Sequence, residues 1–104
     1  MEHDELPLAD LRVVDLTNGL AGPLATMILG DLGADVIKVE ITGRGDLTRD
    51  LAPTMFTAVN RNKRSIALDL KDARGVEVAR RLIKRADVVV ESFRSGVMDR
   101  NGLG

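Results

Sequence analysis

The sequence predicts a parallel α/β sheet whose successive strands are joined by helices. Runs rich in β-branched and apolar residues occur at 11–16, 35–40, 65–70 and 88–90, and segments with helical spacing lie between them. The run Val88-Val89-Val90 is continuously apolar, as is typical of a strand that is buried on both faces of a parallel sheet. Strands that alternate with helices favour right-handed crossovers between parallel strands.

The first strand, residues 11–16, is followed by turn chemistry at Thr17-Asn18-Gly19. Gly22-Pro23 then opens a helix, with proline at the first helical position, where its missing N–H does no harm. Four large apolar residues recur there at helical spacing: Leu24, Met27, Ile28 and Leu32. Gly33 suits the left-handed position just past the end of this helix.

The second half of the chain repeats the pattern after an interruption. Residues 41–57 hold glycines, a proline and mixed charges, and we expect them to be irregular. A basic turn over 60–64 leads into the third strand, and residues 72–86 form the clearest amphipathic helix. A last short helix is expected over 97–100.

Length and composition limit the possible classes of protein. The 104 residues allow one domain at most, and we expect a flexible lead-in over residues 1–10 before a domain over 11–104. With 44% apolar and 30% charged residues the chain is globular, and a net charge of -1 gives no basic bias toward nucleic acid. Two Phe, with no Tyr or Trp, are too few for the base-stacking surface of a protein that binds RNA or single strands, and no apolar run has the length of a membrane span.

Several kinds of catalytic centre are excluded by residue type. The absence of cysteine rules out disulfides, thiolate metal sites and a cysteine nucleophile. The one histidine, His3, lies in the lead-in, so no Ser-His-Asp triad or zinc site can be assembled, and we expect no metal. The acidic first residues argue against a signal or transit peptide, so we expect a cytoplasmic protein.

The first turn is a candidate site for a phosphate group. Its small residues, 18–23, let a ligand approach the backbone, and the following helix offers free N–H groups and the positive end of its dipole. A plain tight turn is the competing interpretation, and the dinucleotide fingerprint G-x-G-x-x-G is absent. Glu40, at a strand end, would be the ribose-binding acid of a dehydrogenase, but a solvated carboxylate explains it as well.

Cations and one aromatic residue follow. Arg61, Lys63 and Arg64, with Lys71 further on, could meet several phosphate charges, or they could form a solvated basic loop. Phe93 stands at the end of the last strand, where it could pack on a purine or belong to the core.

Seven stretches of the chain occur in an order typical of one protein family. They are Val13-Val14-Asp15-Leu16-Thr17, Ala21-Gly22-Pro23, Leu32-Gly33-Ala34-Asp35-Val36-Ile37-Lys38-Val39-Glu40, Gly45-Asp46, Asn60-Arg61-Asn62-Lys63-Arg64-Ser65-Ile66, Leu68-Asp69-Leu70-Lys71, and the run from Ala86 to Arg94 that continues from Gly96 to Arg100. Together they resemble the N-terminal region of family III CoA-transferases, which include formyl-CoA and carnitine-CoA transferases and the related α-methylacyl-CoA racemases.

This resemblance implies a Rossmann-like parallel sheet with flanking helices, the first part of the family's large CoA-binding domain. It also implies that two ring-shaped chains interlock into a homodimer, and that coenzyme A lies against the first turn, the third strand and the turn after the last strand. The implied contacts are Leu20, Ala21, Leu68, Asp69, Leu70, Lys71, Ser92, Phe93, Arg94 and Arg100. Leu20, Ile41 and Ser92 differ from formyl-CoA transferase-like members, which weighs against that particular enzyme.

The resemblance further implies acyl transfer from an acyl-CoA to a carboxylic acid acceptor through an aspartyl anhydride. In the racemase branch, a histidine and an acidic residue instead move a proton next to the thioester. Both sets of catalytic residues lie beyond position 104, so we expect the chain to be a fragment without activity of its own and with exposed apolar faces that promote self-association. A non-catalytic nucleotide-binding module and a nicotinamide-dependent dehydrogenase are the alternatives outside the family.

Overall fold

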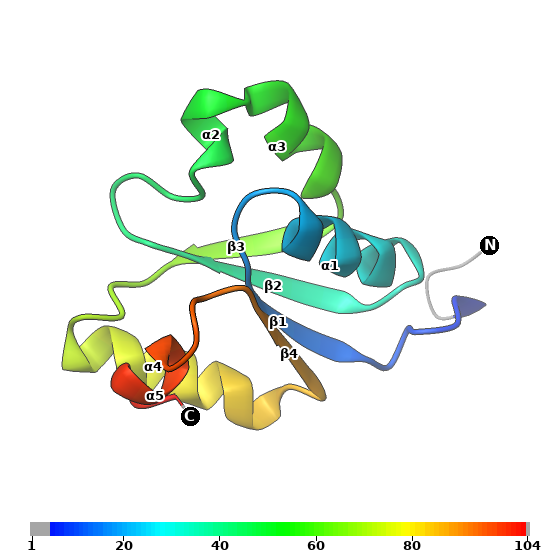
Figure 1. The fold of residues 1–104 in the computed structure, drawn as a ribbon. Helices are drawn as coiled ribbons and strands as arrows, with labels where there is room; N and C mark the ends of the chain where they lie inside the picture. The colour runs from blue at the N-terminus through cyan, green and yellow to red at the C-terminus, as the bar shows by residue number, and fades with distance from the viewer. Residues whose placement is uncertain (1–4, 104) are drawn as a thin grey trace.

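The computed structural model describes residues 5–103, which form one four-stranded parallel sheet (Figure 1). The strands lie in the order β3-β2-β1-β4, so the first strand is internal. Their bounds are β1 Arg12–Leu16, β2 Asp35–Glu40, β3 Lys63–Ala67 and β4 Val88–Glu91. In register, Val13 of β1 stands between Val36 of β2 and Val88 of β4. The predicted α/β class is confirmed.

Helices cover the two faces of the sheet unequally. On the face that is uppermost in Figure 1, called the upper face here, lie α1 (Ala21–Asp31), α2 (Thr48–Leu51) and α3 (Pro53–Val59). On the lower face lie α4 (Ala73–Arg85) and the short α5 (Val97–Arg100). The chain therefore changes face when it crosses from β3 to β4, and β1 is the strand at which the direction of winding reverses.

The structure departs from the predicted elements in three places. Residues 41–57 are not irregular throughout, because Asp46 accepts the N–H of Thr48 at the start of α2 and Pro53 begins α3. The helix α1 begins at Ala21, two residues before Pro23. The strand β3 runs over Lys63–Ala67 instead of 65–70, because its pairing with β2 begins where Val36 faces Lys63.

Other predicted features are confirmed. The strand over 35–40 and the last short helix over 97–100 have the expected bounds. Gly33 adopts a φ of +105°, the left-handed conformation expected just past the end of α1. The amphipathic helix expected over 72–86 is α4, and the side chain of Asp72 caps it by accepting the N–H of Arg74.

The described part of the lead-in is attached to the sheet. The N–H of Leu8 donates to the carbonyl oxygen of Leu32 at 2.9 Å. The N–H of Leu11 donates to the carbonyl oxygen of Leu8. The side chains of Leu8 and Leu11 pack against the small upper core that centres on Val36. His3 lies outside the described residues.

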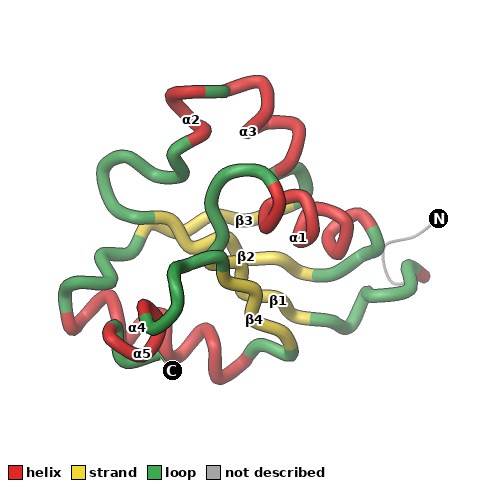
Figure 2. The backbone as a smooth tube through the Cα atoms, in the orientation of Figure 1, coloured by secondary structure: helices red, strands yellow, loops and turns green. Residues whose placement is uncertain are grey.

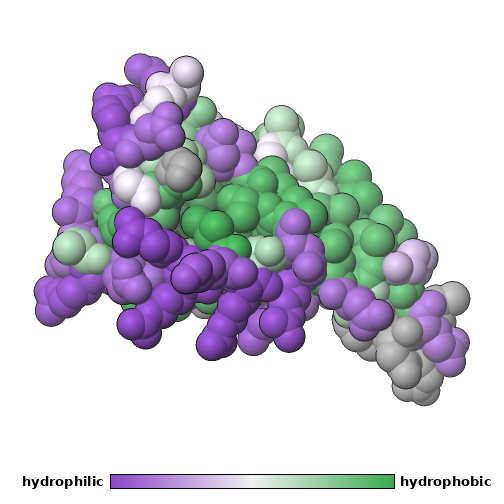
Figure 3. Space-filling model, turned by 90° about the horizontal axis from the view of Figure 1, so that it is seen from below, coloured by the Kyte–Doolittle hydropathy of each residue, from purple (hydrophilic) through white to green (hydrophobic). Residues whose placement is uncertain are grey.

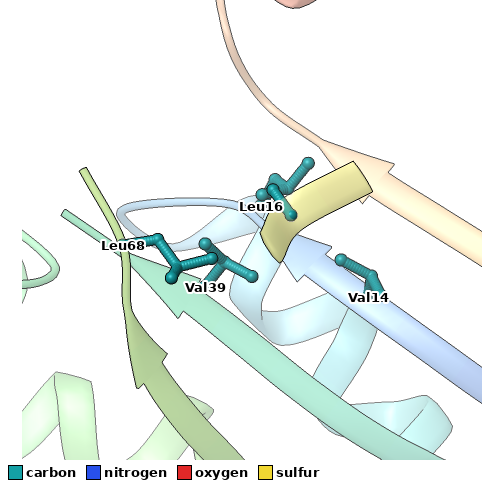
Figure 4. Packing of buried hydrophobic residues seen from close by; sticks show 5 residues of the cluster. Val14, Leu16, Val39 and Leu68 are labelled. Atoms are coloured by element: carbon teal, nitrogen blue, oxygen red, sulfur yellow. The ribbon is translucent and has the colours of Figure 1, made fainter. Parts of the chain in front are cut away.

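The larger core lies on the lower face and is entirely apolar. Val14, Leu16, Val39 and Leu68 project from this face and are each less than 10% exposed (Figure 4). The helix α4 packs against them through Ala79, which is fully buried. Each fully buried large aliphatic side chain contributes about 1.5–3 kcal/mol, so this core is a major source of the stability of the sheet.

Apolar side chains also remain uncovered. Seen from the side of α4 and α5, an apolar area lies among hydrophilic side chains (Figure 3). On the upper face, α1 and the turn before it expose a stripe of large aliphatic residues, each between 40% and 51% accessible: Leu20, Leu24, Ile28 and Leu32. Such a stripe favours contact with a further apolar surface.

We predict that Gly75→Ala is strongly destabilising. A β-carbon at Gly75 would lie 2.0 Å from the carbonyl oxygen of Asp69, so the first turn of α4 or the preceding loop must shift. The expected loss is about 2–3 kcal/mol in the free energy of unfolding, measured by urea denaturation.

The matched control is Gly30→Ala inside α1, where the nearest atom to the added carbon is 3.4 Å away. Its stability should stay the same or rise by up to about 1 kcal/mol because alanine is the better helix former. Equal losses in the two variants would contradict the proposed close approach at Gly75.

Candidate functional site

The loops at the carboxyl ends of the strands gather at one edge of the sheet (Figure 2). Ligands of open α/β sheets bind at this edge, where the direction of winding reverses. Here that point lies between β1 and β4, and the N–H of Asn18 donates to Ser92 Oγ at 3.2 Å across it. The side chain of Asn18 also accepts the N–H of Leu47 at 3.1 Å, so one residue joins three loops.

A pocket of about 520 Å³ opens at this edge beside α5. Its lining combines apolar side chains with two cations, one carboxylate and one amide, and comes from the segments that follow β2, β3 and β4 together with α5. The lining residues are Ile41, Asp69, Leu70, Lys71, Phe93, Val97, Arg100 and Asn101. Lys71 and Arg100 are exposed, whereas Phe93 also packs against the lower core. Such a pocket can hold a flat apolar group beside an anionic one.

The structure brings together half of the residues that sequence reasoning proposed for coenzyme A. Those in the pocket lining are Asp69, Leu70, Lys71, Phe93 and Arg100. Leu20 and Ala21 lie at the start of α1, where no side chain caps the helix. Ser92 is tied to Asn18, Arg94 is exposed outside the lining, and Leu68 is only 8% exposed in the core.

Three lining residues were missing from the proposed contacts. Ile41 directly follows β2, and Val97 and Asn101 belong to α5 and its end. Ile41 could have been found, because a residue that directly follows a parallel strand lies at the ligand-binding edge. Nothing in the local sequence of the last two indicates that they face this pocket.

The side chains of the basic segment form ion pairs within the chain instead of gathering at the pocket. Arg61 donates twice to the carboxylate of Asp31, and Arg64 donates to that of Asp35. Lys63 is buried against Asp15, with 2.9 Å between Nζ and Oδ2. Of the four cations that were proposed to act together, Lys71 alone lines the pocket.

Glu40 is fully engaged inside the protein. Its carboxylate accepts two hydrogen bonds from Arg49, at 2.7 and 2.8 Å, and others from the Ser65 hydroxyl and the N–H of Asp46. Chiefly because of Arg49, the pKa of Glu40 falls to about 2. The guanidinium of Arg49 lies over the ring of Phe56 at 4.1 Å. Glu40 is thus unavailable to a ribose, and the dehydrogenase hypothesis loses its main residue.

Two ion pairs are buried between the upper face of the sheet and the loops above it. Asp15 and Lys38 alternate with apolar residues along β1 and β2, whereas Lys63 begins β3, and the side chains of all three are almost inaccessible. Desolvation lowers the pKa of Lys63, although its hydrogen bond to Asp15 opposes this effect. Burial would raise the pKa of Asp46, but hydrogen bonds, first of all from Lys38, leave it below the usual range.

Among residues 5–103, no three histidine or carboxylate side chains gather closely enough to hold a metal ion. In the same part of the chain, no helix combines the length and apolarity needed to cross a bilayer.

We predict that acid weakens the fold partly through Glu40. Because its pKa is about 2 in the folded chain and ordinarily near 4.5, its contribution is complete above about pH 4.5 and is lost as the pH falls toward 2. Glu40→Gln should remove about 2 kcal/mol of this pH-dependent stability, a value reduced for the partly exposed Arg49.

The measurement is the free energy of unfolding at several values between pH 2 and pH 6, by denaturant titration. The control is Glu77→Gln on the exposed face of α4, which should keep the acid-dependent loss. An identical pH dependence in Glu40→Gln and the unmodified chain would refute the role of Glu40.

A parallel sheet of this strand order, with a pocket and cations at the carboxyl edge, has the architecture of α/β domains that bind nucleotides. The model of one family, described as CoA-transferase family III, matches residues 8–104. The chain therefore belongs to CoA-transferase family III, as its sequence motifs indicated.

Curated relatives and solved structures agree with this assignment. Succinyl-CoA:glutarate CoA-transferase of Mus musculus is 51% identical over 105 residues, which cover 94% of this chain and 24% of the mouse protein. Formyl-CoA:oxalate CoA-transferase of Bradyrhizobium diazoefficiens is 47% identical over 92% of this chain and 24% of its own length. The chain thus spans about a quarter of these relatives.

The crystal structure of a CAIB/BAIF family protein from Brucella suis superposes with a TM-score of 0.91 at 45% identity, over 95% of this chain and 29% of that protein. A crystal structure described as a hypothetical protein from Mycobacterium tuberculosis gives the same TM-score at 46% identity, over 95% and 28%.

Proposed function

We propose that this chain supplies part of the coenzyme A-binding face of an acyl-CoA:carboxylate CoA-transferase. The observation that carries the proposal is the pocket in which Lys71, Phe93 and Arg100 meet at the carboxyl edge of the sheet. It is supported by the family to which the chain belongs, because the relatives similar to this chain include a succinyl-CoA:glutarate and a formyl-CoA:oxalate CoA-transferase.

The chemistry of coenzyme A matches the two kinds of group at this edge. Its adenine would pack against Phe93 and neighbouring apolar side chains, while Lys71 and Arg100 would meet its phosphates. The main chain around Leu20 and Ala21, at the uncapped start of α1, would receive a further polar group. The remaining proposed contacts are Leu68, Asp69, Leu70, Ser92 and Arg94.

In the proposed reaction, the chain binds and orients the acyl-CoA, and an aspartate outside these 104 residues is the nucleophile. Its carboxylate attacks the thioester carbonyl, the C–S bond breaks, and an acyl-aspartyl anhydride forms as the CoA thiolate leaves. The thiolate then attacks the aspartyl carbonyl of this anhydride, which releases the donor carboxylate and leaves an aspartyl-CoA thioester. The acceptor carboxylate attacks this thioester, the C–S bond breaks again, and the thiolate takes the acceptor acyl group from the second anhydride, which frees the aspartate. The role of Lys71 and Arg100 is to hold coenzyme A in place throughout the reaction.

We predict that the chain binds coenzyme A and discriminates against NAD. Calorimetric titration should detect CoA, and Lys71→Met combined with Arg100→Met should weaken its binding at least about tenfold by removing two cations from the phosphates. The matched control is Arg81→Met combined with Lys84→Met on α4, which removes two exposed cations away from this pocket. Tight binding of NAD without binding of CoA would overturn the proposal.

We also predict that the isolated chain does not transfer CoA. Mixed with succinyl-CoA and a dicarboxylic acid, it should leave the thioester unchanged by mass spectrometry, because the proposed nucleophile lies outside its sequence. Formation of a new CoA ester by the purified chain would show instead that one of its own carboxylates performs the chemistry.

A further inference from the structure

Two buried ammonium groups lie directly beneath the first turn of the chain. Lys38, on β2, places Nζ 2.9 Å from the carbonyl oxygen of Thr17 and 2.8 Å from Asp46 Oδ2, and its side chain is 1% exposed. Lys63, on β3, places Nζ 3.0 Å from the carbonyl oxygen of Pro23, and its side chain is 2% exposed. The segment 17–23 is therefore held from below at both of its ends.

Each ammonium group is matched by a carboxylate that is itself fixed. Asp46 also accepts the N–H of Thr48 at 2.9 Å and its hydroxyl at 2.7 Å. Asp15 pairs with Lys63 and accepts hydrogen bonds from the hydroxyls of Thr17 and Thr26. The two lysines consequently have one well-defined position each, set by donors and acceptors from β1, α1 and the loop before α2.

Stability alone is a weak reason for this arrangement. Burying an ion pair costs several kcal/mol per charge in desolvation, and apolar residues of similar volume often serve the fold equally well. What apolar residues cannot do is hold a main-chain carbonyl oxygen in one direction. By comparison, the ion pair Arg64–Asp35 is exposed, and within residues 5–103 its side chains make no hydrogen bond to the main chain.

The direction of a carbonyl fixes the direction of the neighbouring N–H, because a planar trans peptide points the two groups opposite ways. In the peptide between Thr17 and Asn18, the oxygen points down to Lys38 and the N–H reaches Ser92 Oγ. In the peptide after Pro23, the oxygen contacts Lys63 and the N–H of Leu24 donates to Leu20, which closes the first turn of α1.

We propose that Lys38 and Lys63 are positioning residues for the ligand-binding edge. By holding the oxygens of Thr17 and Pro23 inward, they fix the peptides at the two ends of the first turn, and with them the backbone of residues 18–22 that faces the ligand-binding edge. This inference rests on the proposed function, because the ligand whose binding they would support is coenzyme A. Neither lysine lines the pocket, so both act through the backbone of residues 17–23.

The test uses two double variants of the chain, each of which removes an ammonium group and neutralises its partner, so that no buried charge remains unpaired. They are Lys38→Met with Asp46→Asn, and Lys63→Met with Asp15→Asn. The control is Val36→Ala, which removes apolar volume from the upper face of β2 and leaves both lysines in place. The two double variants are independent, so one remains informative if the other fails to fold.

Two measurements separate positioning from a loss of stability. Amide hydrogen exchange and amide chemical shifts should change at residues 18–22 in the double variants, with exchange about tenfold faster or more, while β4 and α4 keep their protection. The dissociation constant for CoA, measured well below the unfolding midpoint, should rise about tenfold. Val36→Ala should lower the midpoint and leave both quantities unchanged.

Folded double variants that keep the exchange rates and shifts of residues 18–22 would overturn the inference, as would a Val36→Ala that weakens CoA equally. If the unmodified chain does not bind CoA, the proposed function fails. Because the exchange measurement needs no ligand, it decides whether the lysines orient the turn even in that case.

Discussion

The turn after β1 is held in place by a pair of buried lysine–carboxylate contacts on the upper face of the sheet. Most parallel sheets cover both faces with apolar side chains, and the lower face here follows that pattern through Val14, Leu16 and Val39. The upper face instead places Asp15, Lys38 and Lys63 beneath the first turn. These charges are tolerated because each finds a partner and further hydrogen bonds, which is the condition for burying an ion.

The two faces of the sheet differ in composition, and this difference explains where the candidate site lies. The lower core aligns the strands and α4, so that the loops after β3 and β4 meet beside α5 and form the pocket. The upper network fixes the turn after β1, and Asn18 joins this turn to Ser92 and Leu47. At the carboxyl edge of the sheet, the turn after β1 therefore lies above the pocket in which Lys71, Phe93 and Arg100 meet.

Much of the fold could be predicted from the sequence because its signals are local. The strand over 35–40, the glycine after α1 and the amphipathic pattern of α4 each follow from a few adjacent residues. Lys71 and Phe93 could be proposed as site residues, since ends of parallel strands converge. The ion pairs of Lys63 and Glu40 could not be predicted. Their partners, Asp15 and Arg49 respectively, are not adjacent in the sequence, and only the fold identifies them. A cation in a basic segment looks solvated until its neighbour in space is known.

The pocket wall and the lysine network share no residue. Ile41, Val97 and Asn101 can therefore be exchanged during evolution without disturbing the groups that orient the first turn. Such separation lets the wall of the pocket vary while the framework of the backbone beneath the first turn stays unchanged.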